Sequence, residues 1–171
     1  MRESNLLVAS IFILLSACTD PMDVDPQWII TPNELKIITQ EHKRTYVLFW
    51  TDWCSGSKLT RDHLFIPFAD TIHRSGLDMA VILIAADENI PLDTIKKQRD
   101  QGLDAYYLQA PGGSPILHRQ AIKKFINDAF PENDLEAISG MFFPIPVKLV
   151  IDHDQKILNR SSREVPAPWE E

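Results

Sequence analysis

Hydrophobic and polar residues are grouped along the chain in blocks that have the lengths of strands and helices. Two continuous apolar runs, Tyr46–Trp50 and Met79–Ala86, have the length of buried strands and are rich in β-branched, aliphatic and aromatic residues. An unbroken apolar run such as Met79–Ala86 is typical of a central parallel strand that is covered on both faces. Ala105–Gln109 has the length of a further short strand. The pattern therefore predicts a sheet with a buried centre.

Polar start signals predict a helix before the first of these strands. Thr31 is an N-cap, and Glu34 at the third helical position completes a capping box with it. The helix is expected to run to about His42. Leu35 and Ile38, one turn apart, are expected on its buried side.

Three further helices are predicted downstream. Leu92–Gln101 is a polar helix that Gly102 caps. A short helix is expected from Asn133 or Asp134 to Ser139. Between them lies a longer amphipathic helix, Pro115–Phe130, whose apolar side is expected to contain Ile116, Leu117, Ile122, Phe125, Ile126 and Ala129.

Cys54 stands at a position where a thiol is activated. It follows the Tyr46–Trp50 strand after a three-residue turn and opens a helical pattern in which Leu59, Leu64 and Phe68 recur. The first turn of a helix has unpaired N–H groups and about half a unit of positive charge, which favours thiolate over thiol. We therefore expect Cys54 to be more nucleophilic than an ordinary cysteine. The alternative is a buried, inert cysteine.

The residues around Cys54 resemble a known motif. Phe49–Ser57 reads Phe-Trp-Thr-Asp-Trp-Cys-Ser-Gly-Ser, which resembles the Phe-Trp-x-x-Trp-Cys-x-x-Cys motif of the thioredoxin superfamily. The resemblance is close up to the last residue, where Ser57 stands in place of the usual resolving cysteine. Ser57 can hydrogen-bond a thiolate at Cys54 but cannot close a disulfide with it.

A second segment resembles the same superfamily. Ile145–Asp152 is similar to the segment in which a cis-proline, here Pro146, leads into a core strand and faces the active-site cysteine. The residues that follow resemble the hairpin of the membrane-anchored, TlpA-like branch, with Gln155 where a glycine is usual. We expect the Ile145–Pro146 bond to be cis.

The two segments imply a fold and a set of site residues. The fold is an α/β thioredoxin-like fold, with a central mixed β-sheet flanked by helices and a helical insertion before the cis-proline strand. By this resemblance the catalytic residues are Cys54, Ser57, Trp53 and Pro146.

Three departures from the superfamily pattern are visible. Leu48 occupies the place of a buried acid, and Thr60 replaces a frequent Glu; both acids serve a resolving thiol that this chain lacks. Pro67 lies beyond the usual kink site of the helix, so we expect a break or bend near Pro67.

Composition and charge exclude several other classes of protein. The 171 residues fit one domain, and 44% apolar with 24% charged residues is ordinary for a globular chain. The net charge of −7 argues against nucleic-acid binding, which needs a basic surface. No metal or cofactor is predicted, because the five histidines lack metal-ligand spacing and are expected in surface or satisfied polar roles: His42, His63, His73, His118 and His153.

The N-terminal residues are expected to direct export. Residues 1–17 have the short apolar core of a signal peptide, and Leu15-Ser16-Ala17-Cys18 resembles a bacterial lipobox, in which Cys18 is lipidated. An ordinary cleaved secretory signal is the alternative. Thr19 mildly favours sorting to the outer membrane, facing the periplasm. An acidic, proline-containing linker (18–27), the thioredoxin-like domain (28–160) and a C-terminal tail (161–171) would follow.

Two functions from different classes are compatible with this sequence. If Cys18 carries lipid, Cys54 is the only thiol in an oxidising compartment, and no internal disulfide can form. The first hypothesis is monothiol exchange, in which Cys54 forms mixed disulfides with envelope proteins or low-molecular-weight thiols while the lipid binds the membrane. The second is a redox-inactive scaffold for an envelope protein.

Overall fold

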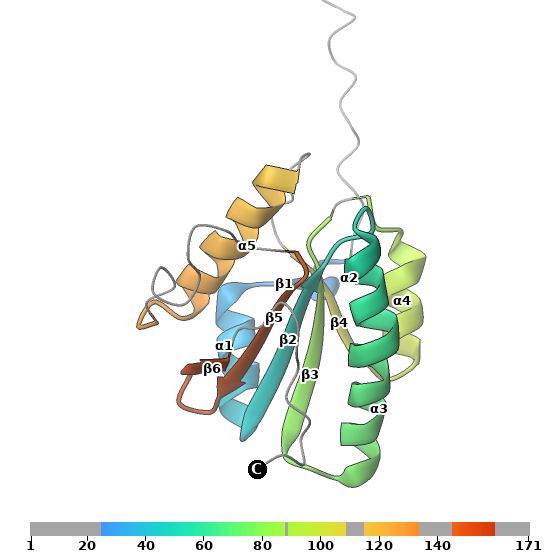
Figure 1. The fold of residues 1–171 in the computed structure, drawn as a ribbon. Coiled ribbons are helices and arrows are strands. Elements are labelled where there is room, and N and C mark those ends of the chain that lie inside the picture. The colour runs from blue at the N-terminus through green and yellow to red at the C-terminus, as the bar shows by residue number, and fades with distance from the viewer. Residues whose placement is uncertain (1–24, 88, 109–114, 134–144, 160–171) are drawn as a thin grey trace, which may run out of the picture.

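The computed structural model describes residues 25–87, 89–108, 115–133 and 145–159, and within them a six-stranded sheet has helices on both faces (Figure 1). The strands are β1 (Ile29–Ile30), β2 (Arg44–Trp50), β3 (Met79–Ala85), β4 (Asp104–Leu108), β5 (Val147–Asp152) and β6 (Ile157–Asn159). The helices are the short 3-10 helix η1 (Pro26–Trp28), α1 (Pro32–Glu41), α2 (Ser55–Thr60), the π-helical turn η2 (Arg61–Phe65), α3 (Ile66–Ser75), α4 (Leu92–Asp100) and α5 (Pro115–Ala129). None of the described helices is long and apolar enough to cross a membrane.

The strand order confirms the predicted fold class. The sheet runs β1-β4-β3-β2-β5-β6. The pairs β1–β4, β4–β3 and β3–β2 are parallel, whereas β2–β5 and β5–β6 are antiparallel. A parallel βαβ unit that continues into an antiparallel hairpin gives the mixed sheet of a thioredoxin-like fold. The short helix expected at 134–139 lies outside the described residues.

The central strand β2 is apolar from Tyr46 to Trp50 because both of its faces are covered. Val47 and Phe49 pack on the face covered by α1 and α5, and Tyr46, Leu48 and Trp50 pack on the face covered by α3 and α4 (Figure 1). Successive side chains of a strand point to opposite faces, so a strand between two helical layers is buried throughout. The unbroken apolar pattern thus results from two hydrophobic cores, one on each side of the sheet.

In the helical segment after Cys54, the residue buried against the sheet is Phe65, whereas the sequence pattern indicated Leu64. Leu64 is 39% exposed, while its neighbour Phe65 is 1% exposed and packs on the sheet. The cause is η2, where the N–H of Ile66 donates to the carbonyl of Arg61, five residues earlier. A π-helical turn inserts one residue, which rotates the following residues relative to the sheet.

Near Pro67, where a break or bend was expected, the structure has this π-helical turn within continuous helical backbone. Pro67 has no N–H to donate and lies directly after η2, in the first turn of α3. The helix does not break there, because α3 continues to Ser75.

α1 agrees closely with its predicted form. Thr31 is the N-cap, and its hydroxyl accepts a hydrogen bond from the N–H of Glu34 at 3.2 Å. The Glu34 carboxylate in turn accepts from the N–H of Thr31 at 2.7 Å, which completes the capping box. Leu35 is buried as predicted, and Ile38 is partly buried against the same core.

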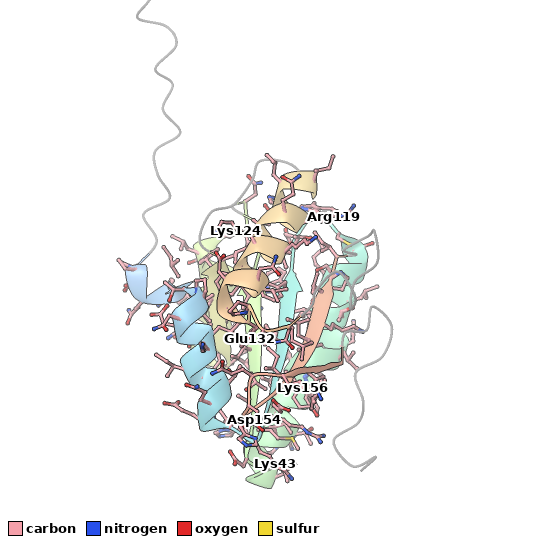
Figure 2. The ribbon with its side chains drawn as sticks, turned by 90° about the vertical axis from the view of Figure 1, so that its left-hand side faces the viewer. Lys43, Arg119, Lys124, Glu132, Asp154 and Lys156 are labelled. Atoms are coloured by element: carbon pink, nitrogen blue, oxygen red, sulfur yellow. The ribbon has the colours of Figure 1, made fainter. Side chains whose placement is uncertain are left out.

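α5 crosses the α1 face of the sheet and differs from its predicted form at its N-terminal end (Figure 2). Its buried face contains Ile122, Phe125, Ile126 and Ala129, as expected. Lys124, on the outer surface, pairs with Asp128. The first turn was predicted to bury Ile116 and Leu117, and this is wrong, because both are exposed. His118 is the buried side chain of that turn.

The β5–β6 hairpin contains an unusual residue at its turn. Gln155 has a φ of 66°, in the left-handed region. Its N–H donates to the carbonyl of Asp152 at 2.9 Å, and the Asp152 carboxylate accepts from the N–H of Lys156 at 2.8 Å. The left-handed backbone needed for this turn is therefore adopted by a residue with a Cβ, at a steric cost that glycine avoids.

Candidate active site

The backbone places Cys54 at the end of the central strand and the start of a helix. β2 ends at Trp50, and Cys54 is the N-cap residue of α2. Its carbonyl accepts from the N–H groups of Ser57 and Lys58 at 3.0 and 3.1 Å. Helical backbone continues from α2 through η2 into α3, so the partly buried thiol lies at the N-terminus of one long helical segment.

The thiol faces the proline segment, which is far away in the sequence. The Cys54 Sγ lies 3.9 Å from the carbonyl oxygen of Ile145. The Ile145–Pro146 peptide bond is cis, as expected from the sequence, and Pro146 directly precedes β5. Because β5 pairs with β2, with Val147 opposite Phe49, the sheet itself brings the proline segment to the turn that carries Cys54.

Ser57 is buried below the turn, and its hydroxyl accepts a hydrogen bond from the backbone N–H of Thr51 at 2.9 Å. The sequence suggested that Ser57 can hydrogen-bond a thiolate at Cys54. The bond that the structure records goes to the strand-helix turn instead. Among the described residues, Cys54 is the free cysteine and no second thiol lies beside it.

Trp53 and His118 form a contact that the sequence did not predict. The Trp53 side chain is 46% exposed, and its Nε1–H donates to the His118 Nδ1 at 3.3 Å. The two ring centroids are 6.4 Å apart, and the ring planes differ by 21°. His118 was expected in a surface or satisfied polar role, yet it is 2% exposed, and its Nε2 has no hydrogen-bond partner among the described residues.

A signal for the burial of His118 was present in the sequence. His118 lies one turn before Ile122 and two turns before Phe125, so it belongs to the buried face of α5 by helical spacing. The contact with Trp53 carries no sequence signal, since the two residues are 65 positions apart.

The residues below the turn are buried on both β2 and β5. Leu48 is fully buried on the face covered by α3 and α4. Lys148 lies opposite Leu48 in the β2–β5 register and is also buried. Residues opposite each other in an antiparallel pair share a face. A buried lysine therefore lies beside Leu48 on this face of the sheet, and the sequence did not predict its burial.

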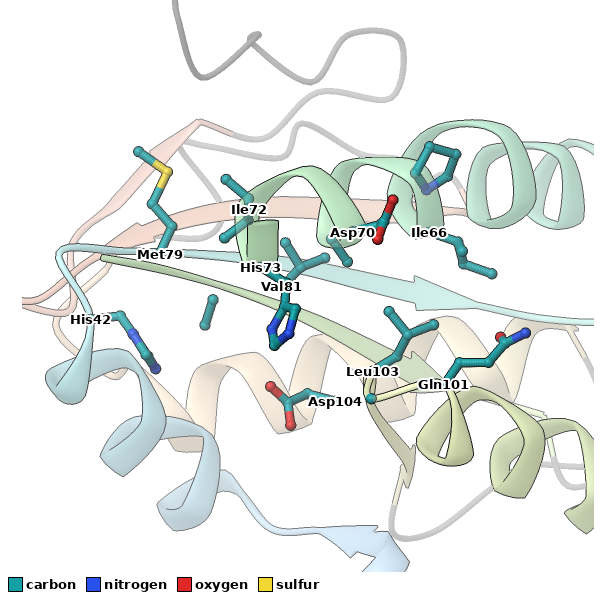
Figure 3. Close-up of a pocket in the computed structure, with 14 residues that line it drawn as sticks. His42, Ile66, Asp70, Ile72, His73, Met79, Val81, Gln101, Leu103 and Asp104 are labelled. Atoms are coloured by element: carbon teal, nitrogen blue, oxygen red, sulfur yellow. The ribbon is translucent and has the colours of Figure 1, made fainter. Parts of the chain in front are cut away.

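A cavity of about 570 Å³ lies elsewhere in the molecule (Figure 3). It is lined by Met79 and Leu103 together with Asp70, His73 and Asp104, near the N-terminal ends of β3 and β4. Loss of solvent raises the pKa of Asp104, and the positive charge of Arg99 offsets part of this rise. Cys54 follows the opposite end of the parallel strands, and it does not line the cavity.

The described residues hold no group of three or more His, Cys, Asp or Glu side chains that would bind a metal ion. Cys18 and the tail 161–171 lie outside the described residues.

Comparison with known proteins gives matches among solved structures. The sequence matches no protein-family model and no curated protein. An uncharacterized conserved protein from Geobacillus kaustophilus is 14% identical, with a TM-score of 0.46 over 76% of this chain and 59% of its own. A hypothetical protein from Sinorhizobium meliloti 1021 is 15% identical, with a TM-score of 0.46 over 80% of this chain and 64% of its own. The chain thus spans less than two thirds of the length of both proteins.

A third solved structure has a functional name. It is a thiol:disulfide interchange protein of the thioredoxin family from Chlorobium tepidum TLS, 18% identical, with a TM-score of 0.40 over 72% of this chain and 71% of its own. Strand order, the Cys54 turn and the cis-proline together give the present chain a thioredoxin-like fold.

Proposed function

We propose that this protein carries out monothiol thiol–disulfide exchange through Cys54, as an exported, lipid-anchored protein with a thioredoxin-like fold. The observation that carries the proposal is the position of the sulfur. It is partly buried at the start of a long helical segment, 3.9 Å from the carbonyl that precedes Pro146. A helix N-terminus is a favourable place for negative charge, and the partly buried Pro146 segment would be the place where an extended partner segment binds.

The chemistry requires one sulfur of this chain and two of the partner. The Cys54 thiolate attacks one sulfur of a partner disulfide, so that a new S–S bond forms at Cys54 and the partner's S–S bond breaks. The second partner sulfur leaves as a thiolate and takes up the proton that Cys54 released. The exchange conserves the number of disulfides, and no additional oxidant is needed.

The mixed disulfide must then be resolved from outside. Ser57 cannot attack it, and its hydroxyl is hydrogen-bonded to the N–H of Thr51. A low-molecular-weight thiol, or another cysteine of the partner, therefore attacks the mixed disulfide and returns Cys54 to the thiolate. The absence of an acid at Leu48 fits this scheme, because no internal proton transfer to a resolving thiol is required.

The N-terminus supplies the proposed location. Lipidation at Cys18, read from Leu15-Ser16-Ala17-Cys18, would anchor the protein to a membrane of the bacterial envelope, with the outer membrane favoured by Thr19. Two or more acyl chains give stable anchoring, whereas one is marginal. The partners would then be envelope proteins with accessible disulfides, or small thiols of that compartment.

One observation favours the second candidate, a redox-inactive scaffold. The Cys54 Sγ is placed as a hydrogen-bond donor to the carbonyl of Ile145, which suits a protonated thiol held inside the turn. In that case the fold serves to bind an envelope protein without covalent exchange, and Cys54 is a structural residue.

Trapping of mixed disulfides in intact cells decides between the two candidates. Cells expressing the full chain are quenched with acid and alkylated, and adducts are compared for the wild type and Cys54→Ala. Ser57→Ala is a matched control, since it changes the neighbouring side chain and leaves the thiol. We expect reducible adducts in the wild type and in Ser57→Ala only. Absence of adducts in the wild type, or equal adducts in Cys54→Ala, supports the scaffold.

A further inference from the structure

The first turn of α5 contains a buried imidazole where the helix is otherwise exposed. Ile116 is 65% exposed and Leu117 is 48% exposed, whereas His118 is 2% exposed. Burying a polar ring costs free energy unless its nitrogen atoms find partners. The partner that the described residues supply is the indole of Trp53, which donates to Nδ1 at 3.3 Å.

The direction of this bond fixes the chemical form of His118. An indole Nε1–H can only donate, so Nδ1 must carry a lone pair. The neutral imidazole then has its proton on Nε2, which is buried and has no partner among the described residues. This form has one acceptor nitrogen, and that nitrogen is used by Trp53.

The bond joins the turn that carries the thiol to α5. Trp53 precedes Cys54 in the turn after β2, while His118 belongs to a helix 65 residues further along the chain. The other tryptophan of the motif, Trp50, is fully buried in the core, so Trp53 is the one that lies at the surface beside the sulfur. A half-exposed indole on a turn has several accessible orientations unless a contact such as this one selects one of them.

We propose that His118 is a positioning residue of the Cys54 site, whose Nδ1 holds the Trp53 indole in the orientation that aligns a polypeptide disulfide with the thiol. The proposal rests on the exchange reaction proposed above. On this proposal, a polypeptide that binds beside Pro146 also contacts the indole, whereas a small disulfide is too short to need that contact. The His118–Trp53 bond therefore sets selectivity for polypeptide disulfides over small ones.

Three full-length chains test the proposal, each carrying Cys18→Ser so that Cys54 is the only thiol. They have the wild-type histidine, His118→Leu, which removes the acceptor, and His118→Asn, whose Oδ1 occupies the position of Nδ1. The rate constant of Cys54 is measured with a peptide disulfide of about ten residues and with 2-hydroxyethyl disulfide. We expect His118→Leu to slow the peptide reaction about threefold to tenfold, the effect of one hydrogen bond. The small disulfide should react within about twofold of the wild-type rate, and His118→Asn should recover most of the peptide rate.

Trp53→Phe provides a second route that does not depend on the folding of the His118→Leu chain. It removes the donor and leaves the histidine, so it should show the same split between peptide and small disulfide. The emission of Trp53, obtained by subtracting the spectrum of the matching Trp53→Phe chain, should change in His118→Leu and remain in His118→Asn.

Each outcome supports or overturns the proposal. Equal slowing with both disulfides assigns His118 a general structural role and overturns it, as does an unchanged peptide rate in His118→Leu and Trp53→Phe. A wild-type chain that reacts with neither disulfide refutes the exchange function itself. The selectivity assigned to His118 is overturned with it, and an unchanged emission of Trp53 in His118→Leu overturns the positioning of the indole independently of any exchange.

Discussion

Replacing Ser57 by cysteine should convert the one-thiol site into a dithiol site. Ser57 lies one helical turn after Cys54, and its N–H donates to the Cys54 carbonyl at 3.0 Å. The Cβ atoms of two residues one helical turn apart lie close to the separation of roughly 3.5–4.5 Å that a disulfide requires. Ser57→Cys should therefore form an internal disulfide with Cys54 under mild oxidation, although Leu48 and Thr60 would keep dithiol turnover slow.

The stability changes of this variant follow from the contacts of Ser57. In the reduced form the buried N–H of Thr51 exchanges a hydroxyl acceptor for a weak sulfur acceptor, which costs about 1 kcal/mol. In the oxidised form, closing so short a loop restricts the unfolded chain by about 2 kcal/mol. The free energy of unfolding should thus fall by about 1 kcal/mol when reduced and rise by about 1 kcal/mol when oxidised.

The assay counts free thiols by mass after labelling with a maleimide, before and after oxidation, in a Cys18→Ser background. Ser55→Cys is the control, because Ser55 is exposed and adjacent to Cys54 in the chain. We expect loss of both thiols in Ser57→Cys and retention of both in Ser55→Cys. If the thiols of Ser57→Cys stay free under mild oxidation, the helix-start geometry described here is wrong.

Three further predictions concern stability and are measured by urea unfolding. Phe65→Ala should lower the free energy of unfolding by about 3–5 kcal/mol, and Leu64→Ala by less than about 0.5 kcal/mol; the reverse order would contradict the π-helical register. Gln155→Gly should raise it by about 0.5–1 kcal/mol, since glycine adopts the φ of 66° without steric cost; a loss of stability would refute that reasoning, and Gln155→Ala should change little. Thr31→Ala should lower it by about 1 kcal/mol through loss of the capping box, and an unchanged midpoint would show that the cap contributes nothing.

Local signals in the sequence were sufficient to predict the central strands, the first helix and the position of the Cys54 site. The apolar runs marked β2 and β3, and the capping signals at Thr31 marked the start of α1. The proline segment was expected opposite Cys54, and it lies there because β5 pairs with β2. Each of these features depends on residues that are close in sequence or on a motif that can be recognised in the sequence as a whole.

Features that depend on packing were not accessible from the sequence. Phe65 is buried in place of Leu64 because the helical turn before Pro67 contains one extra residue. Both residues are apolar, so hydrophobicity alone does not distinguish them. The contact of His118 with Trp53 exists only because α5 crosses the sheet near the Cys54 turn. Ser57 was placed correctly in the motif, but its bond to the Thr51 N–H depends on how the turn closes.

The central claim is that folding activates the Cys54 thiol, and one measurement tests it directly. The full chain with Cys18→Ser is reacted with an activated disulfide at neutral pH, first folded and then unfolded in urea, so that the same thiol is compared with itself. Because folding places the sulfur at a helix N-terminus, an effect worth typically about 0.3–1 kcal/mol, the folded chain should react about twofold to fivefold faster and form one adduct that added thiol releases. An equal or slower rate for the folded chain would contradict the exchange function and leave Cys54 as a structural residue.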